Sequence, residues 1–444
     1  MADVNGRSAR IVDAVRTQLW PVPAIAVLLA LAAGTVLPAM DVAVDGKLPE
    51  NISGFLFGGG PDAARAVLQA IAGSLITVTS LTFSLTVVTL QLASSQFSPR
   101  VLRTFAADRF VHYTLALFMS AFAFALTVLR RVRSSDGAVP GFVPEISVTV
   151  AFLLSIASIL GLVLFLAHLT NEIRAETMMQ RVADETMATL ERNFPHDAGP
   201  PRHAPAAGPG AIRLESARTG FLTSVDREDL LRLAVAEGAV IRVDSLPGAS
   251  LVRGVPFATA WPLDSHTEFE AGRVDRLSHG TNAAIHTGSE RTQVQDAAFG
   301  FRQLADVAAR ALSPGVNDPT TAVHVLGHLS GLLCQIPGRV PGTRCLVDEE
   351  NSVRVVLELP EMAHFLDLSM AQPRLYGTGD PEVARRLLEL LREVSWCDKA
   401  GSHRHAILDQ AQRMEAAIFA AGHLPQDRAA LLEQARALVA ANTA

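Results

Sequence analysis

Long uncharged runs dominate the first 172 residues of the chain. The longest has 34 residues without Asp, Glu, Lys or Arg and lies between Arg65 and Arg100. Three others, of 24, 20 and 26 residues, lie within the ranges 16–41, 109–130 and 145–172. About 20 apolar residues cross the hydrocarbon core of a bilayer. The pattern therefore predicts four membrane-spanning helices, at about residues 20–40, 66–93, 110–129 and 146–169.

The fourth run continues without a stop signal. Neither Gly nor Pro occurs from Leu162 to Phe194, so residues 146–194 are predicted to form one helix of roughly 70 Å. Its later part is amphipathic and has an apolar stripe of Met179, Ala183, Met187, Leu190 and Phe194. The stripe favours packing on the helix's own domain. A stalk that carries motion or holds subunits together is the alternative.

The rest of the sequence predicts a soluble, cytosolic α+β domain. Pro195 ends the long helix, and the following residues have the Pro and Gly content of a linker. We divide the chain into a four-helix transmembrane domain (1–170), a helix extension with linker (171–211), a small α+β subdomain (212–288) and a mainly helical subdomain with a hairpin (289–444). Strands are predicted at 220–225, 239–246, 251–261, 343–347 and 352–359, and helices at 226–238, 289–312, 318–335, 380–396, 401–421 and 425–441.

Composition and charge narrow the class of protein. The net charge of −6 does not support nucleic-acid binding. Three cysteines cannot pair completely, which suits a reducing cytosol. Basic residues near the span ends number eight on one side and five on the other, which favours cytosolic N- and C-termini. The first run is longer than the ~15 apolar residues of a signal peptide, so it is expected to remain as a span.

The second span carries two rows of hydroxyl groups. Thr79, Thr82, Thr86 and Thr89 follow helical spacing on one side, and the nearly opposite side has Thr77, Ser80, Ser84, Gln91 and Ser94. We interpret the threonine row as pore-lining, with the other row bonding a neighbouring helix. The structural alternative is strong, because Ser and Thr in spans often bond their own i−4 carbonyl or hold helices together.

No acidic or basic residue lies at bilayer depth in these runs; only His112 and His168 occur there, both near span ends. Proton-driven carriers usually need buried ionisable groups, whereas a passive pore does not. Four spans are few for enclosing a path within one subunit. The sequence therefore favours a homo-oligomeric, channel-like protein in contact with the lipid bilayer and regulated by its cytosolic domain. The alternative is a membrane-anchored sensor or scaffold that binds a ligand or protein through that domain.

Two groups of basic and polar residues suggest anion binding. Arg100, Arg103 and Arg109 follow the second span beside aromatic residues and suit lipid headgroups, with simple positive-inside anchoring as the alternative. In the soluble part, Arg291 and Gln295 are expected on one helix face, and Asn317 precedes a helix N-terminus, where an anion such as phosphate is bound favourably. The alternative is that Asp318 caps the helix and that the arginines pair internally.

Two long motifs make the chain resemble a bacterial "predicted membrane protein" family classed as a domain of unknown function. The first motif is Leu81–Leu85 (LTFSL) followed by residues 94–100 (SSQFSPR); the second is residues 311–322 (ALSPGVNDPTTA), with residues 291–296 (RTQVQD) before it. The resemblance implies an integral membrane protein with a cytosolic C-terminal region, and carries no activity or catalytic residue. We therefore expect a multi-pass protein of the bacterial inner (plasma) membrane.

Familiar enzyme motifs are missing from the sequence. It has no GxSxG, P-loop or GxGxxG pattern. His324 and His328 lack the acidic residue of HExxH, and Cys397, His403 and His405 fall short of four zinc ligands. We therefore predict no catalytic residue, no cofactor and no metal site, and expect that the protein is not an enzyme.

Overall fold

The computed structural model describes residues 20–44, 56–96, 108–134, 141–172, 174–194, 196, 204–208, 210–264, 268–339 and 342–443. The chain divides into two compact units, Met1–Thr177 and Met178–Ala444, called here the first and second units. About half of the linker predicted at 195–211 lies outside the described residues.

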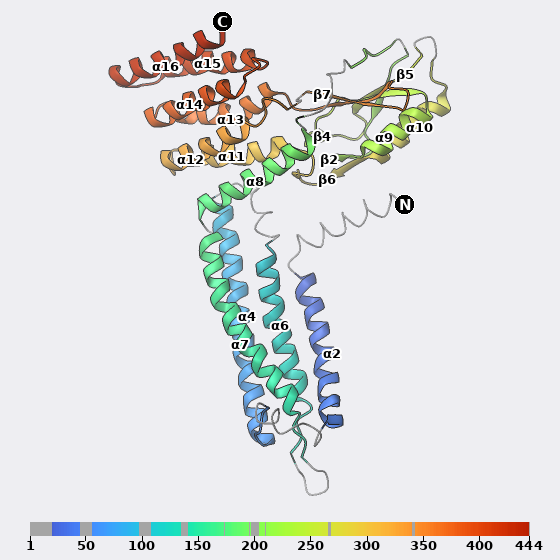
Figure 1. Ribbon diagram of the computed structural model, residues 1–444, viewed down its shortest axis with the longest axis vertical. Helices are drawn as coiled ribbons and strands as arrows, with labels where there is room; N and C mark the ends of the chain where they lie inside the picture. Colours follow the sequence, from blue (N-terminus) through green and yellow to red (C-terminus); the bar gives the residue numbers. More distant parts are fainter. Residues whose placement is uncertain are drawn as a thin grey trace. The chain divides into compact units, whose positions relative to one another are not determined.

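The first unit contains four long helices (Figure 1): α2 (Pro21–Val44), α4 (Pro61–Gln96), α6 (Arg109–Leu129) and α7 (Glu145–Glu172). Each is long and apolar enough to cross a membrane. They occupy the four uncharged runs of the sequence, so the four predicted helices are confirmed.

Helix α6 is the central helix of this unit. It packs against α2, α4 and α7 and is the most buried of the four. Phe118, Phe124 and Val128 are among its fully or almost fully buried side chains. Gly34 of α2 lies so close to α6 that a Cβ there would come within 2.8 Å of the Thr127 Cβ. The contact between α2 and α6 therefore depends on the missing side chain at residue 34.

Two carboxylates, the buried Asp41 and the partly buried Asp108, join helix ends in the first unit. The Asp41 carboxylate, at the C-terminal end of α2, accepts hydrogen bonds from the backbone N–H groups of Ile146 and Ser147 (3.0 and 3.1 Å) and from the Ser147 hydroxyl (2.6 Å). Asp108 caps α6 by accepting from the Phe110 N–H, and its second oxygen lies 2.6 Å from His168 Nε2 of α7. Both acids satisfy the free N–H groups that every helix start exposes.

Most of α8 (Ala175–Asn193) belongs to the second unit, which begins at Met178. The prediction of one helix over 146–194 is wrong, because α7 ends at Glu172 and Arg174 is not helical. The apolar stripe of α8 packs within its own unit, with Met179, Leu190 and Phe194 buried. Gly300 of α11 (Ala297–Ala311) is so close to α8 that a Cβ there would overlap Thr186. The break between α7 and α8 accompanies this packing of α8 on α11. No Gly or Pro in the sequence marks the break.

Two sheets form the α+β part of the second unit. The larger has the strand order β1 (Ile212–Glu215), β5 (Pro256–Pro262), β3 (Ala239–Val243), β8 (Val353–Glu358), β7 (Thr343–Val347); the smaller has the order β4 (Ser250–Leu251), β2 (Gly220–Val225), β6 (Ile285–Gly288). Helices α9 (Arg227–Ala236) and α10 (Ala271–Ala284) pack against their shared core. Strand β3 pairs in parallel with β8, so the larger sheet runs across the subdomain boundary predicted at residue 288.

The remaining helices stack as three successive pairs (Figure 1): α11 with α12 (Pro319–Leu333), α13 (Met362–Gly377) with α14 (Pro381–Cys397), and α15 (Arg404–Ala420) with α16 (Pro425–Thr443). The hairpin of β7 and β8, the Asp318 and Asp380 caps and the last three predicted helices agree with the sequence prediction. Helices α10 and α13 and strands β1 and β6 were not predicted. The helix expected from residue 289 begins only at Ala297.

Asp41→Ala should destabilise the first unit, because it leaves the start of α7 without its cap. Loss of a capping side chain typically costs about 1–2 kcal/mol. The expected result is a lower Tm of the detergent-solubilised protein. Asp62→Ala is the matched control, since the Asp62 side chain at the start of α4 is 94% exposed. Equal Tm values for the two variants would contradict this role of Asp41.

Candidate functional site

The threonine row of α4 points into the packed interior of the first unit. Thr82, Thr86 and Thr89 are buried and Thr79 is half-buried. The hydroxyls of Thr79, Thr86 and Thr89 donate to the i−4 carbonyls of Leu75, Thr82 and Leu85 at 2.7–2.8 Å. The Thr82 hydroxyl is buried without a partner. In a single chain these groups therefore face neighbouring helices, and most of them bond their own backbone.

The opposite side of α4 presents a polar stripe on the surface of the first unit. Its members are exposed and either small or polar: Gln69, Gly73, Thr77, Ser80, Ser84 and Gln91. At 100° per residue they fall within an arc of about 80°, and from first to last they span roughly 33 Å, the thickness of a bilayer core. We call these six residues the α4 polar stripe.

The hydrogen-bonding groups of the α4 polar stripe are largely unused. Thr77 donates to the Gly73 carbonyl (3.1 Å). The side chains of Gln69, Ser80, Ser84 and Gln91 have no partner among the residues that the structure describes. An unpaired amide or hydroxyl in hydrocarbon is costly. The stripe is therefore poorly suited to lipid.

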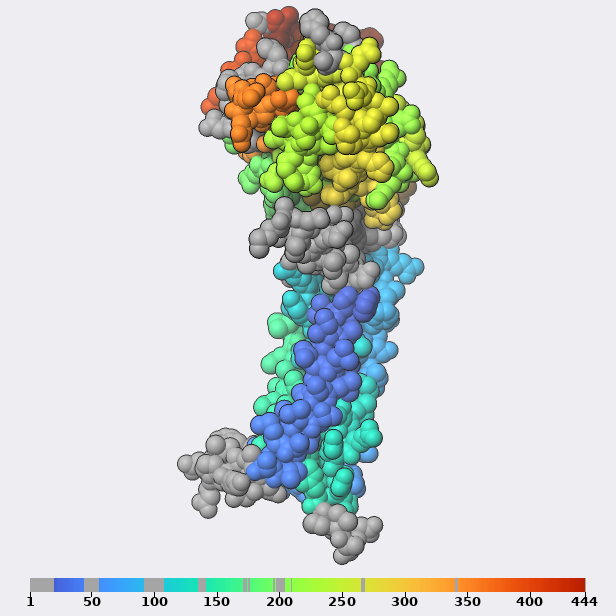
Figure 2. All heavy atoms as spheres, turned by 90° about the vertical axis from the view of Figure 1, so that its right-hand side faces the viewer, coloured from blue at the N-terminus to red at the C-terminus, as the bar shows by residue number. Residues whose placement is uncertain are grey.

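The outward faces of α2 and α7 are largely apolar, whereas α4 exposes the polar stripe, with Val87 inside its arc and other apolar side chains (Ile76, Leu81, Phe83 and Val88) beside it. Helix α7 exposes Phe152, Leu153, Ile156, Ile159, Leu160, Val163 and Leu164. Helix α2, visible in dark blue in Figure 2, exposes Ile25, Leu28, Leu29, Val36 and Met40. These apolar faces match lipid tails. The α4 polar stripe, in contrast, needs a polar neighbour. Thr77, Ser80, Ser84 and Gln91 belong to the row predicted from the sequence, whereas Gln69 and Gly73, which the same helical spacing indicates, were missed; the side chain of Ser94 lies outside the described part of the structure.

The basic residues proposed for lipid headgroups are described only in part. Arg100 and Arg103 lie outside the described residues. Arg109 is the exposed first residue of α6, directly after the Asp108 cap. Its headgroup contact stays a prediction.

The residues proposed for anion binding in the second unit do not form one site. Residues 289–296 are not helical, so Arg291 and Gln295 do not share a helix face as expected. Asn317 lies in the turn after α11, with a left-handed φ of 51°. The fifteen residues of α11 separate it from Gln295 by roughly 22 Å of helix.

Arg291 and Gln295 also have structural partners. Both Arg291 Nε and Nη2 donate to the Asp296 Oδ2 (2.9 and 2.7 Å), and the guanidinium lies over the Phe299 ring. The amide of Gln295 bonds the backbone N–H and carbonyl of Val225. Asp296 is fully buried and caps α11 through the Phe299 N–H. Burial raises the pKa of its carboxyl, and Arg291 opposes that rise.

The chain matches one family along most of its length. The family model described as "Predicted membrane protein (DUF2254)" matches residues 16–393. Uncharacterised proteins of Mycobacterium bovis and Mycobacterium tuberculosis are 33% identical to this chain over 413 residues. The aligned part covers 92% of this chain and 77% of each relative. No solved structure matches the chain. The match covers all four apolar helices and continues into α14.

Arg291→Ala should make stability depend more steeply on pH. Without Arg291 the pKa of the buried Asp296 carboxyl rises further above its ordinary value. Stability is then lost as pH rises from that ordinary value through the higher folded-state pKa. At neutral pH the loss should be roughly 3 kcal/mol, typical of a buried pair with one partner removed.

The measurement is Tm in detergent at pH 5 and pH 8, with Arg232→Ala as control. Arg232 forms an exposed pair with Asp229, and such pairs contribute about 0.5 kcal/mol. The Tm deficit of Arg291→Ala should be larger at pH 8 than at pH 5. A deficit that is the same at both pH values would show that the arginine does not act through Asp296.

Proposed function

The chain belongs to the DUF2254 family of predicted membrane proteins, and on that premise we propose that it is a homo-oligomeric, channel-like membrane protein whose α4 helices face the axis of the assembly. The observation that carries the proposal is the α4 polar stripe. A polar face as long as the bilayer core needs protein or water beside it. Copies of the chain arranged around an axis supply both.

The spacing of the stripe also favours contact between copies. Gly73 and Thr77, and Ser80 and Ser84, are small residues four positions apart. Small residues at this spacing allow membrane helices to approach closely and to bond across the interface. The apolar outer faces of α2 and α7 then remain toward lipid. Hydroxyl and amide groups suit a passive pore, because they replace part of an ion's hydration without any buried charge.

The threonine row has a different role in this arrangement. Thr82, Thr86 and Thr89 are buried between helices of one chain, so we assign them to packing and assign the path to the α4 polar stripe. A path through the interior of a single helix bundle is the alternative that keeps the threonines as pore-lining residues. The two paths make opposite predictions for substitutions in the two rows.

We place the protein in the bacterial inner membrane with both termini in the cytosol. The excess of arginines at one side of the predicted spans supports this orientation. Arg109 and the His168–Asp108 pair then lie at the cytosolic end of the first unit, where Arg100, Arg103 and Arg109 meet anionic headgroups. The second unit is the regulatory domain of this proposal.

Vesicle flux tests the path directly. Purified protein in liposomes should pass ions, and Ser80→Leu with Ser84→Leu should lower the flux several-fold, because two bulky apolar side chains narrow and dry the path. Thr82→Val with Thr86→Val is the matched control in the buried row and should leave flux unchanged. A change of flux in the threonine variant alone would indicate a path inside the helix bundle of a single chain. The absence of flux under varied salt, pH and tension would contradict the channel and favour the membrane-anchored sensor or scaffold.

Cysteine cross-linking tests the assembly independently of flux. In a protein whose three cysteines are replaced by serine, Ser80→Cys and Ser84→Cys should each give disulfide-linked dimers when membranes are treated with a membrane-permeable oxidant, because these positions of different copies lie side by side. Leu160→Cys, on the exposed apolar face of α7, should remain monomeric on the same gels. Dimers from Leu160→Cys and none from the α4 positions would place the wrong helix at the interface.

A further inference from the structure

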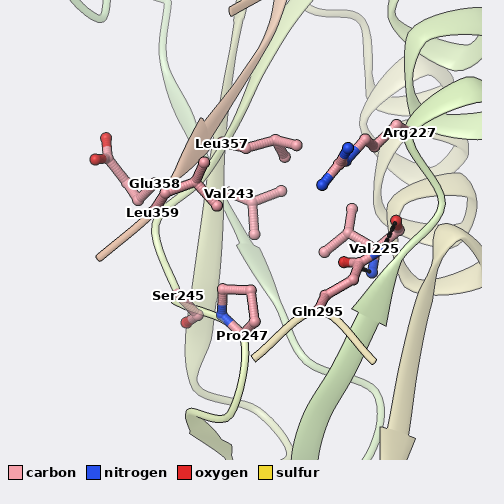
Figure 3. A pocket seen from close by; sticks show the side chains of 9 residues that line it. All are labelled: Val225, Arg227, Val243, Ser245, Pro247, Gln295, Leu357, Glu358 and Leu359. Carbon is pink, nitrogen blue, oxygen red and sulfur yellow. Dashed lines mark hydrogen bonds between the residues drawn. The ribbon is translucent and has the colours of Figure 1, made fainter. Parts of the chain in front are cut away.

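The pocket drawn in Figure 3 is too small to hold a substrate. Arg227, Gln295 and Leu357 are among the residues that line it, and it has room for about one water molecule. The Gln295 amide is already bonded to the Val225 backbone. A small molecule can instead reach the surface of the same unit, where two of the three cysteines lie side by side.

Helices α12 and α14 bring Cys334 and Cys397 together. The two helices pack against each other in the stack of helical pairs (Figure 1). The Ser330 hydroxyl of α12 donates to the Glu393 carboxylate of α14. Cys334 lies four residues after Ser330, and Cys397 lies four residues after Glu393. Residues four apart share a helix face, so the two thiols face each other one turn farther along both helices.

The thiols themselves are in contact. Cys334 and Cys397 share a side-chain hydrogen bond. Arg386 donates to both Glu393 oxygens (3.1 and 3.0 Å), so the carboxylate that sets the register of the two helices is itself held in place. Both cysteines are free, and both lie at helix ends: Cys334 is the C-cap residue of α12, and Cys397 is the last residue of α14. Helix ends tolerate the small adjustment that disulfide geometry requires.

The two thiols differ in exposure. Cys397 is exposed, whereas Cys334 is half-buried. Burial, followed by the contact with Cys397, raises the pKa of the Cys334 thiol to about 12. A thiol with so high a pKa is almost entirely protonated at neutral pH and reacts poorly with a dissolved oxidant. Cys397 is therefore the thiol that meets an oxidant first, and Cys334 is the thiol that reacts second.

We propose that Cys334 and Cys397 are a redox-modification site, which hydrogen peroxide converts to a reversible disulfide. The disulfide links the ends of α12 and α14 and so fixes the second helical pair against the first. Disulfides in the cytosol, where we place the second unit, are usually transient and redox-sensing. The site is independent of any pore.

The oxidation takes two steps. The Cys397 sulfur attacks one oxygen of hydrogen peroxide, the O–O bond breaks, and the other oxygen leaves as water with the thiol proton, which gives a sulfenic acid. The Cys334 sulfur then attacks the sulfenic sulfur. An S–S bond forms, the S–O bond breaks, and the hydroxyl group leaves as water with the Cys334 proton. The two thiols are oxidised by two electrons in total, and the peroxide is reduced to two water molecules.

The contact between the sulfurs allows the second step despite the high pKa of Cys334. A reaction between groups held together in one molecule is much faster than the same reaction between separate molecules. A dithiol reductant restores both thiols by thiol–disulfide exchange. The fold therefore supplies the pairing, and the peroxide supplies the oxidising power.

Peptide mapping of the full-length protein in detergent tests the pair. The protein is treated with hydrogen peroxide, its remaining thiols are alkylated, and the digest is analysed by mass spectrometry without reduction. Wild-type protein should lose two of its three free thiols, and the peptides of Cys334 and Cys397 should be linked. Dithiothreitol should restore all three thiols. Folded protein should form the link at least about tenfold faster than urea-denatured protein, because only the fold holds the two thiols together.

Single variants assign the roles of the two thiols. In Cys334→Ser the sulfenic acid of Cys397 has no partner and should be trapped by dimedone, whereas Cys397→Ser should leave Cys334 unmodified at the same peroxide concentration. Cys345→Ser, which removes the half-buried cysteine of β7, is the matched control and should keep the link.

Four outcomes would overturn the proposal. They are a wild-type link that involves Cys345, a link that forms only between different chains, equal rates of linking in folded and denatured protein, and the absence of any link after peroxide treatment.

Discussion

Hydrocarbon provides no hydrogen-bonding partner, and this constraint governs the first unit. The structure meets it at the helix ends, where Asp41 and Asp108 satisfy exposed N–H groups and join neighbouring helices. Along the helices, threonine hydroxyls on the inner side of α4 turn back to their own carbonyls. The α4 polar stripe breaks this rule within one chain. In the proposed function, a second copy or a water-filled path resolves the conflict.

The second unit obeys the related rule that buried charges need partners. Asp296 is fully buried yet tolerated, because Arg291 and the Phe299 N–H surround its carboxylate. Arg227 departs from this rule, because its Nε is buried without an acceptor, and burial followed by the positive charge of Arg344 lowers its pKa. The pair of Arg291 and Asp296, in contrast, helps to hold the fold together.

The two parts of the chain differ in how far local sequence patterns predict them. The four apolar helices follow from long uncharged runs, because every residue along a membrane span must suit the hydrocarbon around it. In the second unit, capped helices such as the one after Asp318 were predicted well because the cap is a local interaction. The start of α11 was predicted wrongly. The side chain of Arg291 bonds Asp296, and that of Gln295 bonds the backbone of the distant Val225. A helical pattern of residues does not reveal such competing contacts.

The sequence by itself determined that this is a membrane protein with four apolar helices, that α4 has two opposite hydroxyl rows, and that a mixed helical and sheet region follows. These features depend on composition and on the fixed period of the helix. Only the tertiary structure decided which row is buried, because that depends on where α6 and α7 pack against α4. It also decided that β3 pairs with β8 across more than a hundred residues. Contacts between distant residues depend on the packing of whole elements, and no local pattern encodes them.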